Sequence, residues 1–319
     1  MSERCCRLDR SIVVLLPNPN DTPSRKDQIS AKTEQLHRIH GSSVIWDACR
    51  LLGLSIAPTA STIFHRYLHR VSLKDRDVWS AAVASTVLGA KVEDVTLSMR
   101  EVFVAFNHVY RRRFLYFGGG QEELHPPAIS WSKAINLVHG EKVKLLKTIE
   151  PLSQSGPVWK EWKEAFMSAE SSILRELGFT LHWIPKSHSH RYLSSFINDL
   201  GLPDEYHDIA WKYCNDSYLL DLCVRYPASW IAMSSIALAT RTRSTRWSPL
   251  IPGLNDEILA EICNSILGLS NDGAAHAATL GYLPSLRSDS SFTDPTEYLW
   301  YCLEGRLDRN GTSSPSRLA

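Results

Sequence analysis

The spacing of apolar residues is the feature that most constrains the fold of this chain. From about residue 42 to residue 268, apolar side chains recur every three or four positions, the period of a helix buried on one face. Val, Ile and Thr never alternate with polar residues over the length of a strand. The sequence therefore predicts an all-α protein.

The helical pattern falls into two sets. The first is expected at 42–54, 57–71, 77–91, 98–110 and 156–178, and the second at 188–200, 205–220, 227–240 and 255–268. A further helix is plausible near 293–306. Trp79 and Trp230 each open a helix rich in small residues, which suggests two related helical modules.

Helix-end signals are clearest in the first set. Ser98 and Glu101 have the spacing of a capping box, and Pro157 sits near the start of the strongest helix. Gly178 predicts the end of that helix, with Phe179 placed for the apolar contact that accompanies such a cap.

Irregular segments divide the chain. We expect a mobile or loosely packed arm at 1–28, a first domain at 29–182 with an insertion at 111–156, a second domain at 183–270, and a partly disordered extension at 271–319.

Composition excludes several classes of protein. A formal net charge of +1 argues against a chain that mainly binds phosphate backbones. Seven scattered cysteines without a CxxC pair fit reduced thiols in the cytosol or nucleus. The apolar runs are too short for a signal peptide or a membrane span. We therefore expect a soluble intracellular protein.

Enzyme motifs are missing from the sequence. There is no phosphate-binding GxxxxGK[ST] loop, GxSxG elbow, HExxH pair or kinase signature. His188 and His190 are poorly spaced for a metal, so we expect no metal site. Arg111 to Arg113, and Arg241, Arg243 and Arg246, are interpreted as solvated charge runs at helix ends.

Two charged residues interrupt apolar helix faces. Lys91 shares a face with Val87 and Leu88, and Glu170 lies among Phe166 and Ile173. Such groups need polar partners once they are covered. Another protein could supply these partners, or the two side chains could pair with each other.

Two motifs resemble the cyclin box. "AKVEDV", from residue 90, looks like the family's KxEE signature, and "AESSILRELGFTL", from residue 169, is similar to the signature that closes the box. Among cyclins, "RIHGSSVIWDACRLLGL" at 38, "VFVAFNHVYRRR" at 102 and the segment from 210 resemble cyclin L. The likeness covers about residues 22 to 270.

The resemblance implies two tandem cyclin boxes of about five helices each, the second of which can be degenerate. It implies a non-catalytic regulatory subunit that binds and activates a cyclin-dependent serine/threonine kinase in transcription and pre-mRNA splicing. The chain would then act in the nucleus, with the cytoplasm as a second compartment, and form a heterodimer with the kinase. It would need no cofactor, because ATP and magnesium belong to the kinase.

The resemblance also implies which residues bind the kinase. The matching Lys and Glu contact main-chain groups near the kinase C-helix, and neighbouring positions make apolar contacts. In this sequence these positions are Lys91, Glu170, Leu88, Val92, Leu174, Phe179 and Leu181.

Four departures from the pattern stand beside this interpretation. "HRYL" replaces the DRFL element, the MRAIL docking helix has no counterpart, the loop at 111–156 is unusually long, and an Arg-Ser-rich tail is absent.

Three alternatives are also open. The first is a nucleic-acid-binding transcription factor with cyclin-like repeats, and the second is a transcriptional cyclin of the K, T or Q type. The third is an unrelated helical enzyme that uses Glu170 or the histidines, for which no motif speaks.

Overall fold

The structure is a computed structural model that describes residues 21–117, 153–240, 251, 253–281, 283 and 286. All regular secondary structure within these residues is helical, as the sequence predicts. The helices are α2 (Pro23–Lys26), α3 (Ala31–Leu52), α4 (Ala57–Leu68), α5 (Val78–Val92), α6 (Met99–Phe117), α9 (Pro157–Glu176), η1 (Ile184–Ser187), α10 (His190–Asp199), α11 (Glu205–Ser217), α12 (Leu222–Arg225), α13 (Ala228–Thr240), α14 (Asp256–Asn271) and α15 (Gly273–Leu280).

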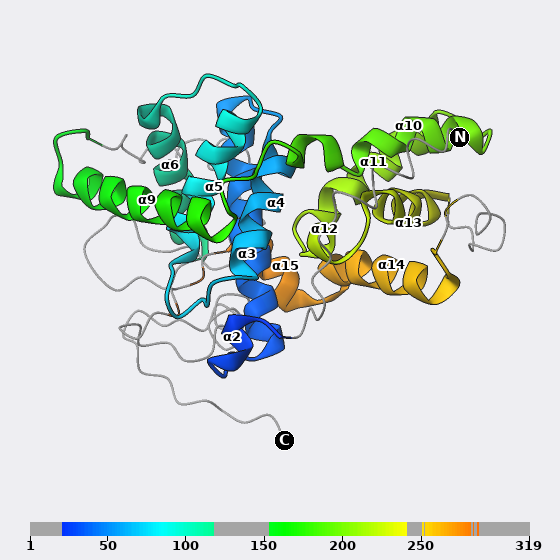
Figure 1. The fold of residues 1–319 in the computed structure, drawn as a ribbon, viewed down its shortest axis with the longest axis horizontal. Helices are drawn as coiled ribbons and strands as arrows, with labels where there is room; N and C mark the ends of the chain where they lie inside the picture. The colour runs from blue at the N-terminus through cyan, green and yellow to red at the C-terminus, as the bar shows by residue number, and fades with distance from the viewer. Residues whose placement is uncertain are drawn as a thin grey trace.

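The helices form two groups, which Figure 1 shows side by side. Helices α3 to α6 and α9 surround one apolar core, in which Phe64, Phe103 and Ile173 are fully buried. Helices α10, α11, α13 and α14 enclose a second core around Ile197 and Ile236. That each group is one cyclin box stays a prediction.

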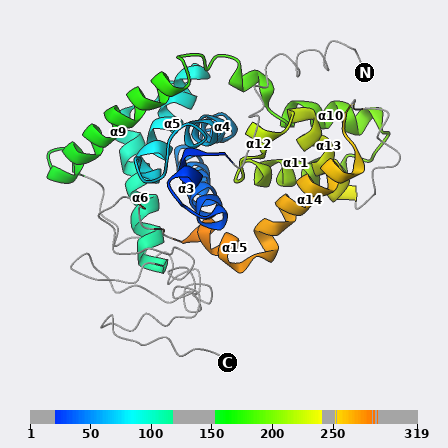
Figure 2. The same ribbon diagram turned by 60° about the horizontal axis from the view of Figure 1, so that its bottom comes forward.

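Helix α3 belongs to both groups. Val44 and Ile45 lie in the first core, whereas Leu36 and Ile39 join a cluster with residues of α13, α14 and α15. Figure 2 shows α15 running from the end of α14 back to α3. The predicted extension at 271–319 therefore begins as a packed helix, and the helix expected at 293–306 lies outside the described residues.

Helix α5 runs through the middle of the first group and is buried over most of its length, from Val78 to Ala90. Its small residues allow close approach: a Cβ added at Gly89 would lie 3.3 Å from the backbone of Ala60 on α4. The Asp77 carboxylate caps the helix by accepting a hydrogen bond from the Ser80 N–H, at 2.9 Å. Both ends of α5 thus agree closely with the predicted range.

Helix α3 starts earlier than its apolar pattern predicts, because its first half buries polar side chains. Arg38 donates to the carbonyl oxygens of His65 and Leu68, at 3.1 and 2.9 Å, and pairs with Glu34 at 2.8 Å. Those carbonyls lie at the end of α4 and require donors once they are buried. In the first half of α3, a polar residue such as Arg38 therefore lies on the buried face of the helix.

The end of the predicted N-terminal arm is packed. Thr22 donates a buried hydrogen bond to Glu34 at 2.8 Å, and the hydroxyl of Ser24 accepts from the Leu73 N–H at 3.1 Å. The arm prediction is therefore wrong for residues 21–28, and residues 1–20 lie outside the described part of the chain.

Helix α6 continues past Tyr110 to Phe117, so the insertion predicted at 111–156 begins as helix. Arg113 is buried, with 1% of its surface exposed, and pairs with Asp47 at 2.7 Å. Arg112 pairs with the same carboxylate at 2.6 Å. The prediction of a solvated charge run is wrong here, because Arg113 is buried and the half-buried Asp47 supplies its counter-charge. Residues 118–152 and 241–250 lie outside the described residues.

No helix within the described residues has the length and apolar character needed to cross a membrane.

Candidate interaction site

The two charged residues singled out in the sequence face each other. Helices α5 and α9 pack side by side, and the Lys91 ammonium donates to a Glu170 carboxylate oxygen at 2.7 Å. The Lys91 side chain is 62% exposed and that of Glu170 is 18% exposed. The structure thus settles the point that the sequence left open: in the free chain the two side chains satisfy each other.

This ion pair contributes little to stability. An exposed pair of this kind is worth about 0–1 kcal/mol, because water and salt screen the attraction. Lys91 also lies in the last turn of α5, where a positive charge suits the helix dipole. A partner could therefore bind this cation and this anion with little loss of folding stability, even if the ion pair itself were broken.

The predicted apolar contact residues differ in accessibility. Leu88 and Leu181 are 3% and 5% exposed and belong to the first core. Val92 and Leu174 are half-buried and pack against that core. Phe179 is 70% exposed. The Lys91–Glu170 pair therefore lies near half-buried Val92 and Leu174, which a partner could contact. Leu88 and Leu181 are core residues, so their side chains are not accessible to a partner in the free chain.

Phe179 is held outward by the end of α9. The Phe179 N–H donates to the Leu174 carbonyl at 2.9 Å and the Gly178 N–H to that of Arg175 at 3.2 Å, the two bonds of a Schellman motif. Gly178 ends the helix as predicted, at φ 66°, and Phe179 follows at φ 59°. The prediction that Phe179 makes the apolar cap contact is wrong, because its ring lies in solvent.

Exposing Phe179 in this conformation is costly. A left-handed backbone at a residue other than glycine costs about 1–3 kcal/mol. The ring also keeps its apolar surface in water. Both costs would be offset if another protein covered the ring.

Met167 is a surface residue that the sequence interpretation did not include. Its side chain is 55% exposed and lies one turn before Glu170 on α9. Positions 167, 170 and 174 share one helix face, so this spacing was a signal available in the sequence. An exposed methionine next to a charged pair adds a flexible apolar contact.

The histidines considered for metal binding have other partners. His188 lies 2.7 Å from the Thr59 hydroxyl and His190 lies 2.8 Å from the side-chain oxygen of Asn215. Burial lowers the pKa of His188 to about 4. No group of three or more potential metal ligands occurs within the described part of the chain.

His65, which replaces the aspartate of the DRFL element, has a structural role. Its Nε2 lies 3.0 Å from the carbonyl oxygen of Tyr218, to which Ser42 also donates at 2.6 Å. Burial lowers the pKa of His65 to about 3, so the ring is neutral at physiological pH. The histidine thus joins α4 to the chain after α11 without carrying a charge.

Comparison with known proteins finds relatives but no matching family model. Cyclin-L1-1 of Arabidopsis thaliana is 28% identical over 222 residues, which cover 69% of this chain and 45% of the relative. Cyclin-L2 of Mus musculus is 26% identical over 280 residues, which cover 82% of this chain and 47% of the relative. Cyclin-L1 of Homo sapiens is 27% identical over 258 residues, which cover 78% of this chain and 42% of the relative. The chain spans a little under half the length of these relatives.

A solved structure shares the fold. A chain in the crystal structure of the yeast RNA Pol II CTD kinase CTDK-1 complex superposes with a TM-score of 0.52 at 13% identity, over 99% of this chain and 85% of that chain. At this identity the match concerns the fold alone. The sequence relatives and the shared fold together confirm that this chain resembles the cyclins and, among them, cyclin L.

Proposed function

We propose that this protein is a regulatory cyclin subunit that binds and activates a cyclin-dependent serine/threonine kinase. The observation that carries the proposal is the Lys91–Glu170 pair at the surface, together with the exposed ring of Phe179 just beyond the end of α9. The protein has no catalytic role of its own in this proposal. ATP and magnesium are bound by the kinase.

The face can recognise a helix of the kinase through its main chain. An ammonium seeks carbonyl oxygens and a carboxylate seeks N–H groups, which the two ends of a helix expose. Met167, Val92 and Leu174 lie within one turn of the pair along α9 and α5, and the exposed Phe179 adds apolar area beyond the end of α9. Binding here would hold the kinase C-helix inward, so that its glutamate pairs with the ATP-binding lysine.

The cellular role proposed is in transcription and pre-mRNA splicing within the nucleus. It is supported by the names of the relatives, which are all L-type cyclins. The transcription or splicing machinery would then be a further partner of the heterodimer.

The test uses charge reversal at the pair. Lys91→Glu and Glu170→Lys are each expected to weaken kinase binding about 30- to 4,000-fold, since reversing a charge at a covered interface costs about 2–5 kcal/mol. Unfolding free energy should change by no more than about 1 kcal/mol. Affinity capture from nuclear extract, with kinase activity as readout, identifies the partner; titration with that kinase gives Kd.

The double variant Lys91→Glu/Glu170→Lys separates a contact role from a structural one. It restores the internal ion pair with opposite polarity, so the fold regains its pair while the partner still meets the wrong charges. We expect binding to remain weak. Full binding by the double variant would show that kinase binding needs only the ion pair within this chain, and that neither side chain contacts the kinase directly. Lys212→Glu, an exposed reversal on α11, is the matched control.

A further inference from the structure

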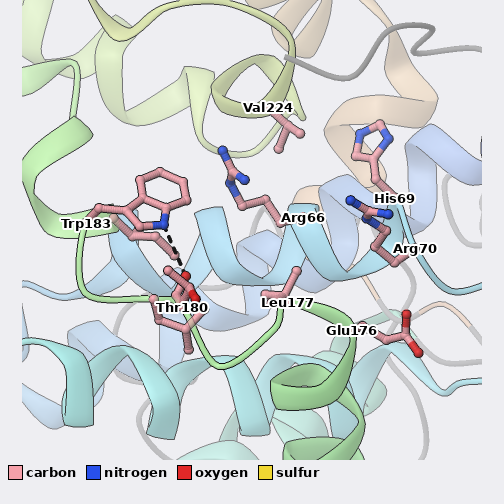
Figure 3. Close-up of a pocket in the computed structure, with 10 residues that line it drawn as sticks. Arg66, His69, Arg70, Glu176, Leu177, Thr180, Trp183 and Val224 are labelled. Atoms are coloured by element: carbon pink, nitrogen blue, oxygen red, sulfur yellow. Dashed lines mark hydrogen bonds between the residues drawn. The ribbon is translucent and has the colours of Figure 1, made fainter. Parts of the chain in front are cut away.

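A pocket of about 230 Å³ lies between α4, the end of α9 and α12. Figure 3 shows Arg66 from the last turn of α4 between Trp183 and Val224, with His69 and Arg70 from the residues that follow the helix. Further lining comes from apolar side chains that include Leu177 and Ile184. The pocket is thus apolar in its walls and basic at one side.

Arg66 is held in this pocket against an aromatic ring. Its guanidinium carbon lies 4.2 Å from the centre of the Trp183 ring, and its Nε is buried without an acceptor among the described residues. The indole is fixed by its own N–H, which donates to the Thr180 carbonyl at 3.1 Å. Burial lowers the pKa of Arg66, yet a guanidinium keeps its proton at physiological pH. Stacking therefore orients a charged guanidinium whose Nε–H is left without an acceptor among the described residues.

The carboxylates nearby do not neutralise the pocket. Asp221 is engaged by His69 at 3.1 Å and by Arg225 at 3.8 Å. Glu176 lines the pocket, but within the described residues it forms no ion pair with Arg66 or Arg70 within 4.0 Å. Two guanidinium groups thus face one free carboxylate and leave an excess of positive charge.

We propose that this pocket binds a phosphorylated serine or threonine side chain presented by another polypeptide. A phosphate monoester carries a charge of about −1.5 to −2 at pH 7, which matches two arginines better than a single carboxylate does. Its oxygens accept the paired N–H groups of a guanidinium. The apolar walls suit the carbon atoms of the phosphorylated side chain, which free phosphate lacks. The inference goes beyond the proposed function and does not depend on it.

Fluorescence polarisation of the whole chain tests the site. The probes are labelled degenerate peptide pools whose central residue is phosphothreonine, phosphoserine, glutamate or unmodified threonine. We expect the two phosphorylated pools to bind at least 10-fold more tightly than the others, and more weakly as salt rises. Arg70→Gln, an exposed change, should weaken phosphopeptide binding about 10- to 100-fold, because hydrogen bonds to charged groups are the strong ones.

Arg66→Lys and Arg100→Gln complete the test. Arg66→Lys keeps the charge but loses the planar fork, and we expect a loss of binding similar to that of Arg70→Gln, with folding checked by thermal unfolding. Arg100→Gln removes an exposed charge on α6 outside the pocket and should leave binding unchanged. Equal binding of all pools, or an equal loss in Arg100→Gln, would overturn the proposal. So would competition by inorganic phosphate at the same concentration as phosphopeptide, because that marks a free-phosphate site.

Discussion

At the level of single residues, burial determines how much each charged pair contributes to the free energy of unfolding. Arg113 is almost completely buried and depends on Asp47, whereas Arg112, on the same carboxylate, keeps 27% of its side chain exposed. Asp47→Ala should lower the free energy of unfolding by about 3–5 kcal/mol, because it leaves Arg113 without its counter-charge. Arg112→Ala should cost no more than about 1 kcal/mol. Urea unfolding of both variants checks this, and equal losses would contradict it.

At the scale of the element, helix-to-helix distance depends on single glycines. A Cβ at Gly41 on α3 would lie 2.2 Å from the buried ring of Phe64, whereas one at Gly268 on α14 meets nothing within 4 Å. We expect Gly41→Ala to destabilise the protein by about 1–3 kcal/mol through overpacking. Gly268→Ala should stabilise it by about 0.5–1 kcal/mol through helix propensity. Thermal unfolding of the two variants should move Tm in opposite directions.

At the scale of the whole molecule, buried neutral histidines make stability depend on pH. Burial lowers the pKa of His37 to about 4 and that of His65 to about 3, from an ordinary value of 6.5. The unfolded chain therefore binds protons first as pH falls, so stability is complete above pH 6.5 and is lost from there toward pH 4 and below. Urea titrations between pH 7.5 and 4.5 should show this fall.

His37→Leu is the matched variant for that titration. The Nε2 of His37 has no hydrogen-bond partner among the described residues, so an apolar replacement removes a titrating group without breaking a bond seen at that atom. The slope of stability against pH should decrease by up to about 1.4 kcal/mol per pH unit between pH 6 and 4.5. An unchanged slope would show that His37 does not contribute.

The sequence predicts most helices of this fold, because α5 and α9 carry regular apolar stripes and recognisable caps. It fails at the start of α3 and at Arg113, where buried polar groups depend on partners far away in the chain. For the candidate site, periodicity placed Lys91 and Glu170 on apolar faces. Their pairing could not be predicted, since the two residues are 79 positions apart in the sequence and meet only through the packing of α5 against α9.

The return of α15 to α3 has a consequence for biosynthesis. His40 on α3 approaches the carbonyl of Ala278, 238 positions later, at 3.4 Å. At about 5–20 residues per second, a ribosome needs roughly 10–50 s to make the intervening chain. During that interval Leu36 and Ile39 lack the apolar cover that α15 later provides. The newly made first half therefore exposes these apolar side chains, and is prone to aggregate through them, until translation reaches the last described helix.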